Sequence, residues 1–282
     1  MLKIVECPRD AMQGIDVFIP TEKKVDYLNQ LLKVGFDTLD FGSFVSPKAI
    51  PQLADTKEVL PQLDLGSSKT KLLAIVANYR GAEDAASFEE INYLGYPFSI
   101  SETFQQRNTN ASIEQSISRV EEIQTLCMKS KKQLVIYLSM GFGNPYGDPY
   151  HEDILAKWIE RLSELDIKIF APSDTIGVAK PELINSIYTT LIPEFLNLEI
   201  GAHLHTTPDS WEEKVDAAYQ AGCRRFDGAI AGYGGCPMAA DELTGNMPTE
   251  RMIDYFLDQG EDLGLDLDAF DEARAEASNV FL

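Results

Sequence analysis

Short apolar runs alternate along the chain with longer segments in which apolar residues recur every three or four positions. The short runs have the length and composition of β-strands, and they span residues 3–7, 38–42, 72–78, 97–101, 134–140, 167–173, 198–205 and 225–231. The longer segments have the period of amphipathic helices, as at Ile113, Ile117, Val120 and Ile123. Strand-then-helix units repeated in this way predict a parallel sheet covered by helices.

Signals for helix starts fit this alternation. Ser112 to Gln115 has the form of a capping box, and Pro181 suits the first turn of a helix. Because no break in composition divides the units, we expect one α/β domain over residues 1–282, a single (β/α)8 TIM barrel. The alternative is an open doubly wound sheet. It is disfavoured because no G-x-G-x-x-G follows the first strand, and the glycine-rich run 232–235 follows the last one.

Composition and charge restrict the class of protein. A chain of 282 residues with 44% hydrophobic residues can bury a sizeable core. Its net charge of −21 argues against binding nucleic acid or an anionic membrane surface. The sequence has no apolar run long enough to span a membrane and no signal-peptide pattern. Its 4 cysteines lack C-x-x-C spacing, so we expect a reduced, cytoplasmic setting.

Polar side chains gather at the ends of the predicted strands. In a parallel barrel the C-terminal strand ends share one rim, where functional groups collect. The polar residues at these ends are Arg9, Asp10 and Gln13 (strand one), Asp40 and Ser43 (two), Ser173 and Asp174 (six), His203 and His205 (seven), and Cys236 and Asn246 (after eight). Barrel closure places strands seven, eight and one side by side. Asp10, His203, His205 and Asn246 can therefore meet.

Two of the 3 histidines, His203 and His205, lie one residue apart. In a strand this spacing aims both imidazoles to the same side. From the histidine pair alone, a metal-binding role and an ordinary packing role are about equally consistent with the sequence. Adding Asp10 and Asn246 gives nitrogen and oxygen ligands without thiolate, a set typical of an octahedral ion with open positions. The sequence therefore favours Mg²⁺ or Mn²⁺ over structural zinc.

The residues next to this ligand set have more than one possible role. Pro8 interrupts strand pairing, so we expect a loop that leaves the sheet and lets Arg9 and Asp10 both face the site. Arg9 either holds a substrate oxygen or forms an ion pair at the strand end. Asp40 is as consistent with a supporting or helix-capping carboxylate as with a catalytic one. Cys236, in a glycine-dense loop, is a candidate for proton transfer or oxidation.

Five motifs resemble, in this order, those of the 3-hydroxy-3-methylglutaryl-CoA lyase family over nearly the whole chain. They are P-R-D-x-x-Q at 8–13, S-F-V-S-P-K at 43–48, S-D-T-I-G at 173–177, H-x-H at 203–205 and A-G-Y-G-G-C-P at 231–237. The resemblance implies a metal-dependent TIM barrel that cleaves hydroxymethylglutaryl-CoA to acetyl-CoA and acetoacetate. That retro-Claisen reaction serves leucine breakdown and ketone-body formation.

The resemblance also implies roles for single residues. The metal ligands fall on Asp10, His203, His205 and Asn246, and the catalytic arginine and cysteine fall on Arg9 and Cys236. The predicted catalytic set is Arg9, Asp10, Asp40, His203 and Cys236, in which His203, together with Cys236, handles protons. The predicted contacts to the acyl-CoA substrate are Gln13, Ser43, Ser173 and Asp174.

The chain departs from the family pattern at several positions. Cys7 and Ala11 replace glycines, Asp40 replaces a glutamate, Thr206 replaces an aspartate, and Tyr233 and Met238 stand for leucine and tyrosine. These changes leave the acyl preference open. Alternatives are a condensing enzyme related to isopropylmalate or homocitrate synthase, an aldolase for 4-hydroxy-2-oxo acids, and a barrel that only binds acyl-CoA or a protein. The sequence is consistent with a homodimer.

Overall fold

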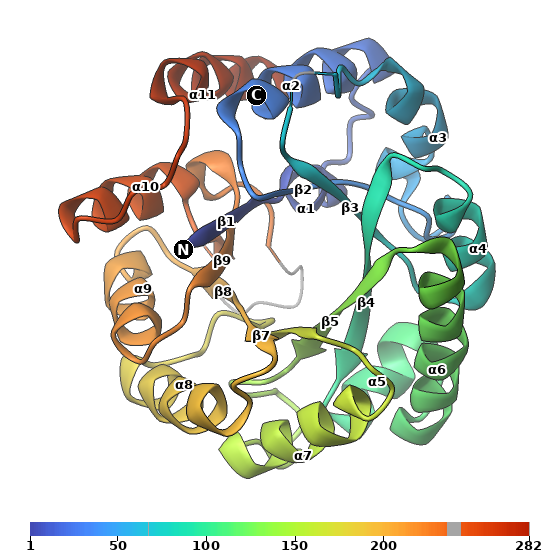
Figure 1. Cartoon of the computed structure of the whole chain (residues 1–282), viewed down its shortest axis with the longest axis vertical. Coiled ribbons are helices and arrows are strands. Elements are labelled where there is room, and N and C mark those ends of the chain that lie inside the picture. The colour runs from blue at the N-terminus through green and yellow to red at the C-terminus, as the bar shows by residue number, and fades with distance from the viewer. Residues whose placement is uncertain (67, 236–243, 282) are drawn as a thin grey trace.

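The strands close into a parallel barrel. The computed structural model describes residues 1–66, 68–235 and 244–281. Its strands are β1 (Lys3–Glu6), β2 (Thr38–Ser43), β3 (Lys71–Ile75), β4 (Ile91–Ser99), β5 (Gln133–Ser139), β6 (Ile169–Asp174), β7 (Glu199–Ile200), β8 (Ala202–Thr206), β9 (Arg225–Gly228) and β10 (Gly245–Asn246). Both β7 and β8 pair with β6, so they share the seventh position, and β9 closes the ring by pairing with β1. The predicted (β/α)8 barrel is confirmed (Figure 1).

Except for the short helix α1, which lies at the end of the barrel, the helices surround the barrel on its outer side (Figure 1). They are α1 (Pro8–Gln13), α2 (Thr21–Val34), α3 (Thr56–Val59), α4 (Tyr79–Ala86), α5 (Glu102–Thr109), α6 (Ile113–Ser130), α7 (Glu152–Ser163), α8 (Pro181–Glu194), α9 (Trp211–Gln220), α10 (Thr249–Asp258) and α11 (Leu267–Phe281). Short 3-10 turns are η1 (Pro51–Leu53), η2 (Leu60–Gln62) and η3 (Ile230–Gly232). None of the described helices has both the length and the hydropathy needed to cross a membrane.

Some element bounds differ from the predictions. β4 begins at Ile91, well before the expected start at residue 97, because Gly95 and Pro97 read as turn signals although both pair with β5. The segment after β1 is the helix α1 rather than a loop. Pro8 occupies its first turn, where a missing N–H is not needed. The two predicted helix starts are confirmed, with a capping box at Ser112 and Pro181 in the first turn of α8.

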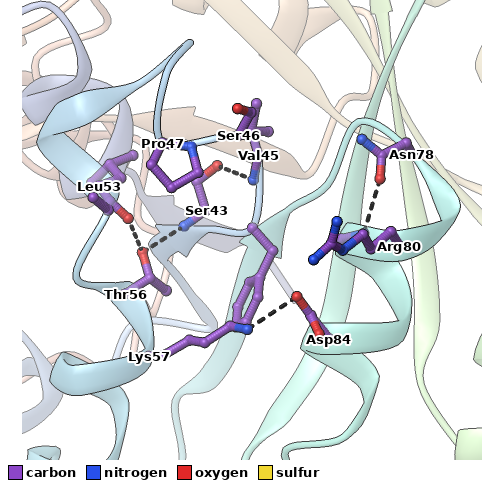
Figure 2. A pocket seen from close by; sticks show the side chains of 13 residues that line it. Ser43, Val45, Ser46, Pro47, Leu53, Thr56, Lys57, Asn78, Arg80 and Asp84 are labelled. Atoms are coloured by element: carbon purple, nitrogen blue, oxygen red, sulfur yellow. Dashed lines mark hydrogen bonds and ion pairs between the residues drawn. The ribbon is translucent and has the colours of Figure 1, made fainter.

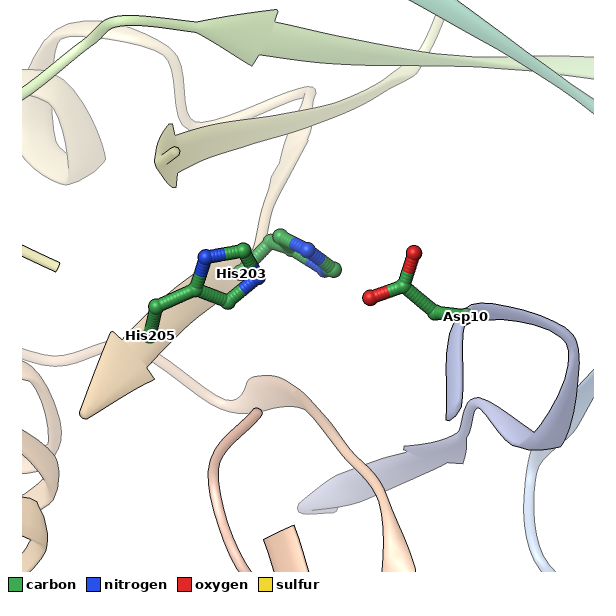
Figure 3. A group of neighbouring side chains, drawn as sticks. All are labelled: Asp10, His203 and His205. Carbon is green, nitrogen blue, oxygen red and sulfur yellow. The ribbon is translucent and has the colours of Figure 1, made fainter. Parts of the chain in front are cut away.

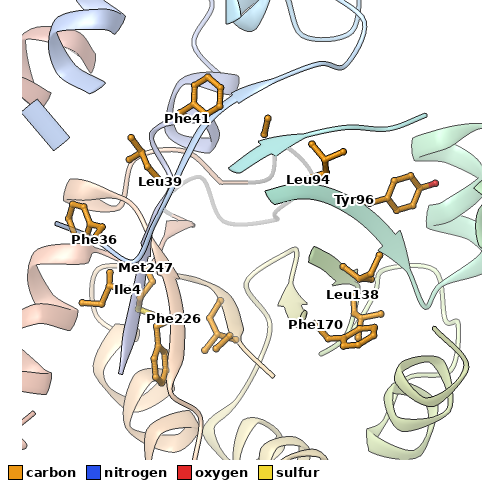
Figure 4. Packing of buried hydrophobic residues seen from close by; sticks show 14 of the residues in the cluster. Ile4, Phe36, Leu39, Phe41, Leu94, Tyr96, Leu138, Phe170, Phe226 and Met247 are labelled. Carbon is orange, nitrogen blue, oxygen red and sulfur yellow. The ribbon is translucent and has the colours of Figure 1, made fainter. Parts of the chain in front are cut away.

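Apolar side chains fill two separate zones. Because side chains alternate along a strand, one set points outward to the helices and the other points into the barrel bore. The outward set, seen in Figure 4, includes Ile4, Leu39, Leu94, Leu138, Phe170 and Phe226. The inward apolar set comes from β3 to β6 and comprises Leu73, Ile75, Tyr93, Val135, Tyr137, Ile169 and Ala171. Each fully buried side chain of this kind stabilises the fold by about 1.5–3 kcal/mol.

Candidate metal centre and active site

Side chains from α1 and β8 converge at the C-terminal rim of the barrel. One ligand atom from each of Asp10, His203 and His205 lies within 4.8 Å of the other two (Figure 3). β10 adds a fourth residue, because its antiparallel pairing puts Asn246 opposite His205. The Nδ2 atom of Asn246 donates to Oδ2 of Asp10 at 2.9 Å and to the Tyr233 carbonyl at 2.8 Å. The structure thus brings together the four residues predicted to meet.

Hydrogen bonds orient both imidazoles. Nδ1 of His205 lies 3.0 Å from the Thr175 carbonyl, which can only accept, so Nδ1 carries the proton. Nδ1 of His203 lies 3.1 Å from Oδ2 of Asp227. In each ring Nε2 is then the atom with a free lone pair. Nε2 of His205 is buried and has no hydrogen-bond partner among the residues that the structure describes.

Burial and the surrounding charges shift the pKa values of all three clustered residues. Burial raises the pKa of Asp10, but Arg9 and the two imidazoles lower it further, so the net shift is well below the usual range. Burial and then His203 lower the pKa of His205, which keeps that ring neutral. Burial lowers the pKa of His203, but Asp227 outweighs it and raises the net value. Asp227 thereby makes the His203 ring a more basic donor.

Arg9 connects the cluster to Asp40. Its Nε and Nη2 both donate to Oδ2 of Asp40, at 3.0 and 2.6 Å, while Nη1 donates to Asp10 at 2.8 Å and to Gln13 at 2.9 Å. Burial raises the pKa of Asp40 to about 6, against the attraction of Arg9, so the carboxylate remains ionised at neutral pH. Asp40 is completely buried behind Arg9 and does not line the cavity. Of the two roles considered for it, this geometry favours the supporting one.

A cavity of about 400 Å³ opens over the cluster. Its lining includes Arg9, Asp10, Gln13, His203 and His205. Other rim segments contribute Val45, Ile50, Phe104, Asn108, Tyr137, Ser139, Ser173 and Thr175. The cavity therefore combines ionisable groups with apolar and hydroxyl groups.

The whole chain matches one family description. The HMGL-like family model covers residues 2–276, which is nearly the full sequence. The chain belongs to the HMGL-like family. This confirms the resemblance carried by the sequence motifs.

Individual HMGL-like relatives match over most of their length. The chain is 34% identical over 252 residues to hydroxymethylglutaryl-CoA lyase YngG of Bacillus subtilis, covering 89% of this chain and 83% of the relative. The solved structure of a Bacillus subtilis HMG-CoA lyase has a TM-score of 0.92 at 30% identity and covers 99% of this chain and 93% of its own. An HMG-CoA lyase of Acinetobacter baumannii, described in complex with coenzyme A and 3-methylmalate, has a TM-score of 0.89 at 31% identity, with 100% and 91% coverage.

The donor set of this HMGL-like protein fits a divalent cation. It offers one carboxylate, two imidazole nitrogens and an amide, and the buried Nε2 of His205 lacks a partner among the described residues. A packing role for the histidines would leave that nitrogen unsatisfied at a buried position, which proteins avoid. Both imidazoles also have Nδ1 held by an oxygen, the arrangement usual for metal-binding histidines.

Two predicted substrate contacts lie outside this cavity. Asp174 is buried, and its carboxylate accepts hydrogen bonds from the backbone of Val178 and Ala179 and from Nζ of Lys214 at 2.9 Å. It therefore braces the loop after β6 rather than facing a ligand. Ser43 lines a neighbouring cavity, and its hydroxyl accepts from the backbone N–H of Val45. Gln13 and Ser173 line the main cavity.

The glycine-rich segment before Cys236 lies against the cluster. A Cβ on Gly234 would come within 2.7 Å of both Nδ2 of Asn246 and the Asp10 carbonyl, so only glycine fits there. Gly234 also has φ of +90°, which favours glycine. Gly235 lines the cavity. Cys236 itself lies outside the described residues.

The remaining cysteines and His151 lie away from the ligand positions of the cluster. Cys7, Cys127 and Cys223 are free and buried, and burial raises the pKa of each thiol. They are therefore poor nucleophiles. His151 is exposed, and its Nδ1 accepts from the backbone of Asp153 at the start of α7.

Asp227 is the functional neighbour that the sequence analysis missed. It lies on β9 in register with His203 and contacts that ring. One signal was available: the strand sequence R-F-D-G puts Arg225 and Asp227 on the same face of a short buried strand. Charged residues on the inner face of a barrel strand need partners. Which partner they have depends on barrel closure.

Proposed function

We propose that this protein cleaves 3-hydroxy-3-methylglutaryl-CoA to acetyl-CoA and acetoacetate in a retro-Claisen reaction that requires a divalent cation. The observation that carries the proposal is the convergence of Asp10, His203 and His205 beside Arg9 on the wall of one cavity. The names of the HMGL-like relatives support the substrate, and the coenzyme A in a neighbouring structure supports an acyl-CoA. Such a reaction would place the protein in leucine breakdown, and we propose a cytoplasmic setting for it.

The proposed ion is Mg²⁺ or Mn²⁺. Its ligands would be the Asp10 carboxylate, Nε2 of His203 and of His205, and Oδ1 of Asn246. When bound, such an ion polarises the oxygens of a chelating substrate as a Lewis acid. Arg9 adds positive charge from the protein itself. Its guanidinium is held by Asp40 at one edge, which aims the other edge towards Asp10 and the cavity.

Two proton transfers accompany the break between the hydroxyl-bearing carbon and the α-carbon of the thioester. The hydroxyl loses a proton to solvent water as it becomes the acetoacetate ketone, and the acetyl-CoA enolate gains one. Nδ1 of His203 is held by Asp227, so Nε2 is the nitrogen left to bind the proposed ion. We therefore assign His203 as a ligand, in place of the proton role expected from the sequence. Delivery of the proton to the enolate is assigned to Cys236, which follows the glycines that line the cavity.

The neighbouring cavity has space for part of the coenzyme. Its volume is about 430 Å³, and it shares Val45 with the main cavity (Figure 2). Arg80 and Lys57 line it, and Lys57 is paired with Asp84 at 3.0 Å. In a chain of net charge −21, these two cations provide local positive charge for phosphates. We assign the neighbouring cavity to the coenzyme A portion of the substrate.

The test is product formation from the proposed substrate. Purified protein is incubated with hydroxymethylglutaryl-CoA and Mg²⁺ or Mn²⁺, and acetoacetate and acetyl-CoA are measured in parallel. Equal amounts of both products are expected, and EDTA should abolish them. Cys127→Ala, far from the rim on α6, is the control and should remain nearly fully active.

A panel of other substrates separates the alternatives. Cleavage of a 4-hydroxy-2-oxo acid, or condensation of acetyl-CoA with a 2-oxo acid, without cleavage of hydroxymethylglutaryl-CoA would replace the proposal by the aldolase or the condensing enzyme. Asp40→Glu tests the departure from the family pattern. If the shorter carboxylate is fitted to Arg9, this variant should be less active because the longer side chain shifts the guanidinium.

A further inference from the structure

A group of buried polar atoms lies in the barrel bore below the metal centre. Arg225 is 1% exposed, Asp227 3% and Tyr137 7%. Four of their atoms have no hydrogen-bond partner among the described residues: Nε and Nη2 of Arg225, Oδ1 of Asp227 and the hydroxyl of Tyr137. Buried polar atoms in folded proteins are nearly always satisfied, so this concentration needs an explanation.

The three side chains face the same space. Arg225 and Asp227 are two residues apart on β9, so both point into the bore. The Tyr137 ring packs edge-on against His203, with ring centroids 5.4 Å apart, and His203 in turn contacts Asp227. Burial lowers the pKa of Arg225, but the charges of Asp227 and then Tyr137 raise it more strongly.

The backbone makes room for Arg225. A Cβ on Gly201, between β7 and β8, would lie 2.9 Å from Cδ of Arg225. Below, Nη1 of Arg225 donates to Oε1 of Glu199 at 3.1 Å and lies 3.7 Å from Oδ2 of Asp37. Glu199 thus fixes one end of the guanidinium, and Nε and Nη2 remain for another partner.

The chemistry of the four atoms identifies that partner. Arg225 presents two donors, Asp227 one acceptor, and the Tyr137 hydroxyl can accept or donate. An anion is disfavoured because Glu199, Asp37 and Asp227 already face Arg225, and a cation is disfavoured by the two N–H groups. A water molecule accepts two hydrogen bonds and donates two, which matches all four atoms. Buried waters typically make about three such bonds.

We propose that Arg225, Asp227 and Tyr137 enclose an ordered water in the barrel bore, and that this water-linked group positions His203 through Asp227. The water ties Oδ1 of Asp227 to Arg225, while Oδ2 holds Nδ1 of His203. Arg225 is therefore a positioning residue for the metal centre, anchored below by Glu199. The positioning role rests on the proposed metal function of His203, whereas the water does not.

The first test is a crystal structure of the full chain at high resolution, without added metal. We expect one water peak within about 3.2 Å of all four atoms. Direct hydrogen bonds among Arg225, Asp227 and Tyr137, with no water between them, would overturn the proposal.

The second test is Mn²⁺ affinity, measured by electron paramagnetic resonance without substrate. Arg225→Met should weaken binding about 10- to 100-fold, the usual effect of losing a partner behind a metal ligand. Arg224→Met is the matched control, because its side chain is 44% exposed and stacks on Tyr219 away from the bore. Its affinity should equal that of the unmodified protein. Unchanged affinity in a folded Arg225→Met variant would contradict the positioning role.

Two further variants keep the test decisive. In a His203→Ala background, Arg225→Met should cause no additional loss, because its effect passes through His203. If Arg225→Met does not fold, Tyr137→Phe removes only the hydroxyl and should still weaken Mn²⁺ binding several-fold. An unchanged affinity there would equally refute the positioning role. The variants could show the expected Mn²⁺ affinities while the protein fails to cleave hydroxymethylglutaryl-CoA. That result would overturn the proposed function and leave the positioning role of Arg225 in place.

Discussion

The two sides of the barrel bore differ in chemistry. The strands β3 to β6 contribute an inward apolar set running from Leu73 to Ala171. The strands β2, β8 and β9 carry Asp40, His203, Arg225 and Asp227, all buried or nearly so. Apart from the Tyr137 hydroxyl, the apolar side stabilises the fold by burial alone, whereas each charge on the other side requires a partner. The metal centre lies over the charged side, so the residues that carry function are the ones whose burial is least favourable.

The largest effect is expected when a metal ligand on the charged side is removed. Asp10→Ala or His203→Ala should strongly weaken Mn²⁺ binding and lower activity at least about 10³-fold, since a bound cation contributes several kcal/mol to the transition state. Activity and binding are measured on the same preparations. Substantial activity in either variant would contradict the assignment of Asp10 and His203 to the metal centre.

Glu6 is a buried carboxylic acid on β1 that faces outward from the barrel bore, and its titration can be tested. Its Oε1 accepts from the backbone of Ile230 and Oε2 contacts Thr249. Burial raises its pKa from 4.5 to about 8, although both contacts favour the charged form. The folded chain then holds a proton that the unfolded chain releases, so stability should fall with rising pH between 4.5 and 8.

The matched variant for that effect is Glu6→Gln. The difference in unfolding free energy between the two proteins should change by roughly 1.4 kcal/mol per pH unit through this window. Urea denaturation at several pH values measures it. Parallel stability profiles for the two proteins would show that Glu6 titrates normally.

Asp40→Asn tests a paired charge on the functional side. It leaves Arg9 buried with Asp10 as its remaining carboxylate partner, so we expect a loss of about 3 kcal/mol in unfolding free energy. Activity should fall as well, because Asp40 fixes the orientation of Arg9. A variant as stable as the parent would mean that the ion pair contributes nothing net.

Ile169→Val is the smallest test and lies on the apolar side. Ile169 is a member of the inward apolar set on β6. Shortening it should lower stability by about 1 kcal/mol and leave Mn²⁺ affinity unchanged. A change in affinity would show that the two sides of the bore are coupled, against the separation described above.

The residues at the rim could be predicted from the sequence because barrel closure follows from strand order alone. It placed Asp10, His203, His205 and Asn246 together although they lie on separate segments. Alternation along β8 was enough to aim both histidines to one side.

The remaining details depend on contacts that no local pattern contains. Asp174 reaches the correct rim, but Lys214 on α9 and the backbone of its own loop occupy its carboxylate. Asp40 is at the predicted strand end, yet Arg9 covers it. Pro8 was read as a strand breaker because the same residue type starts helices and interrupts sheets. Asp227 became recognisable only once His203 was found beside it.

The most direct measurement is the position of Mn²⁺ in crystals of the protein, located by its anomalous scattering. We predict a single strong peak at the C-terminal rim, about 2 Å from an Asp10 oxygen and from Nε2 of both His203 and His205. A peak bound elsewhere, or none at saturating Mn²⁺ with these side chains ordered as described, would contradict the assignment of this cluster as the metal centre.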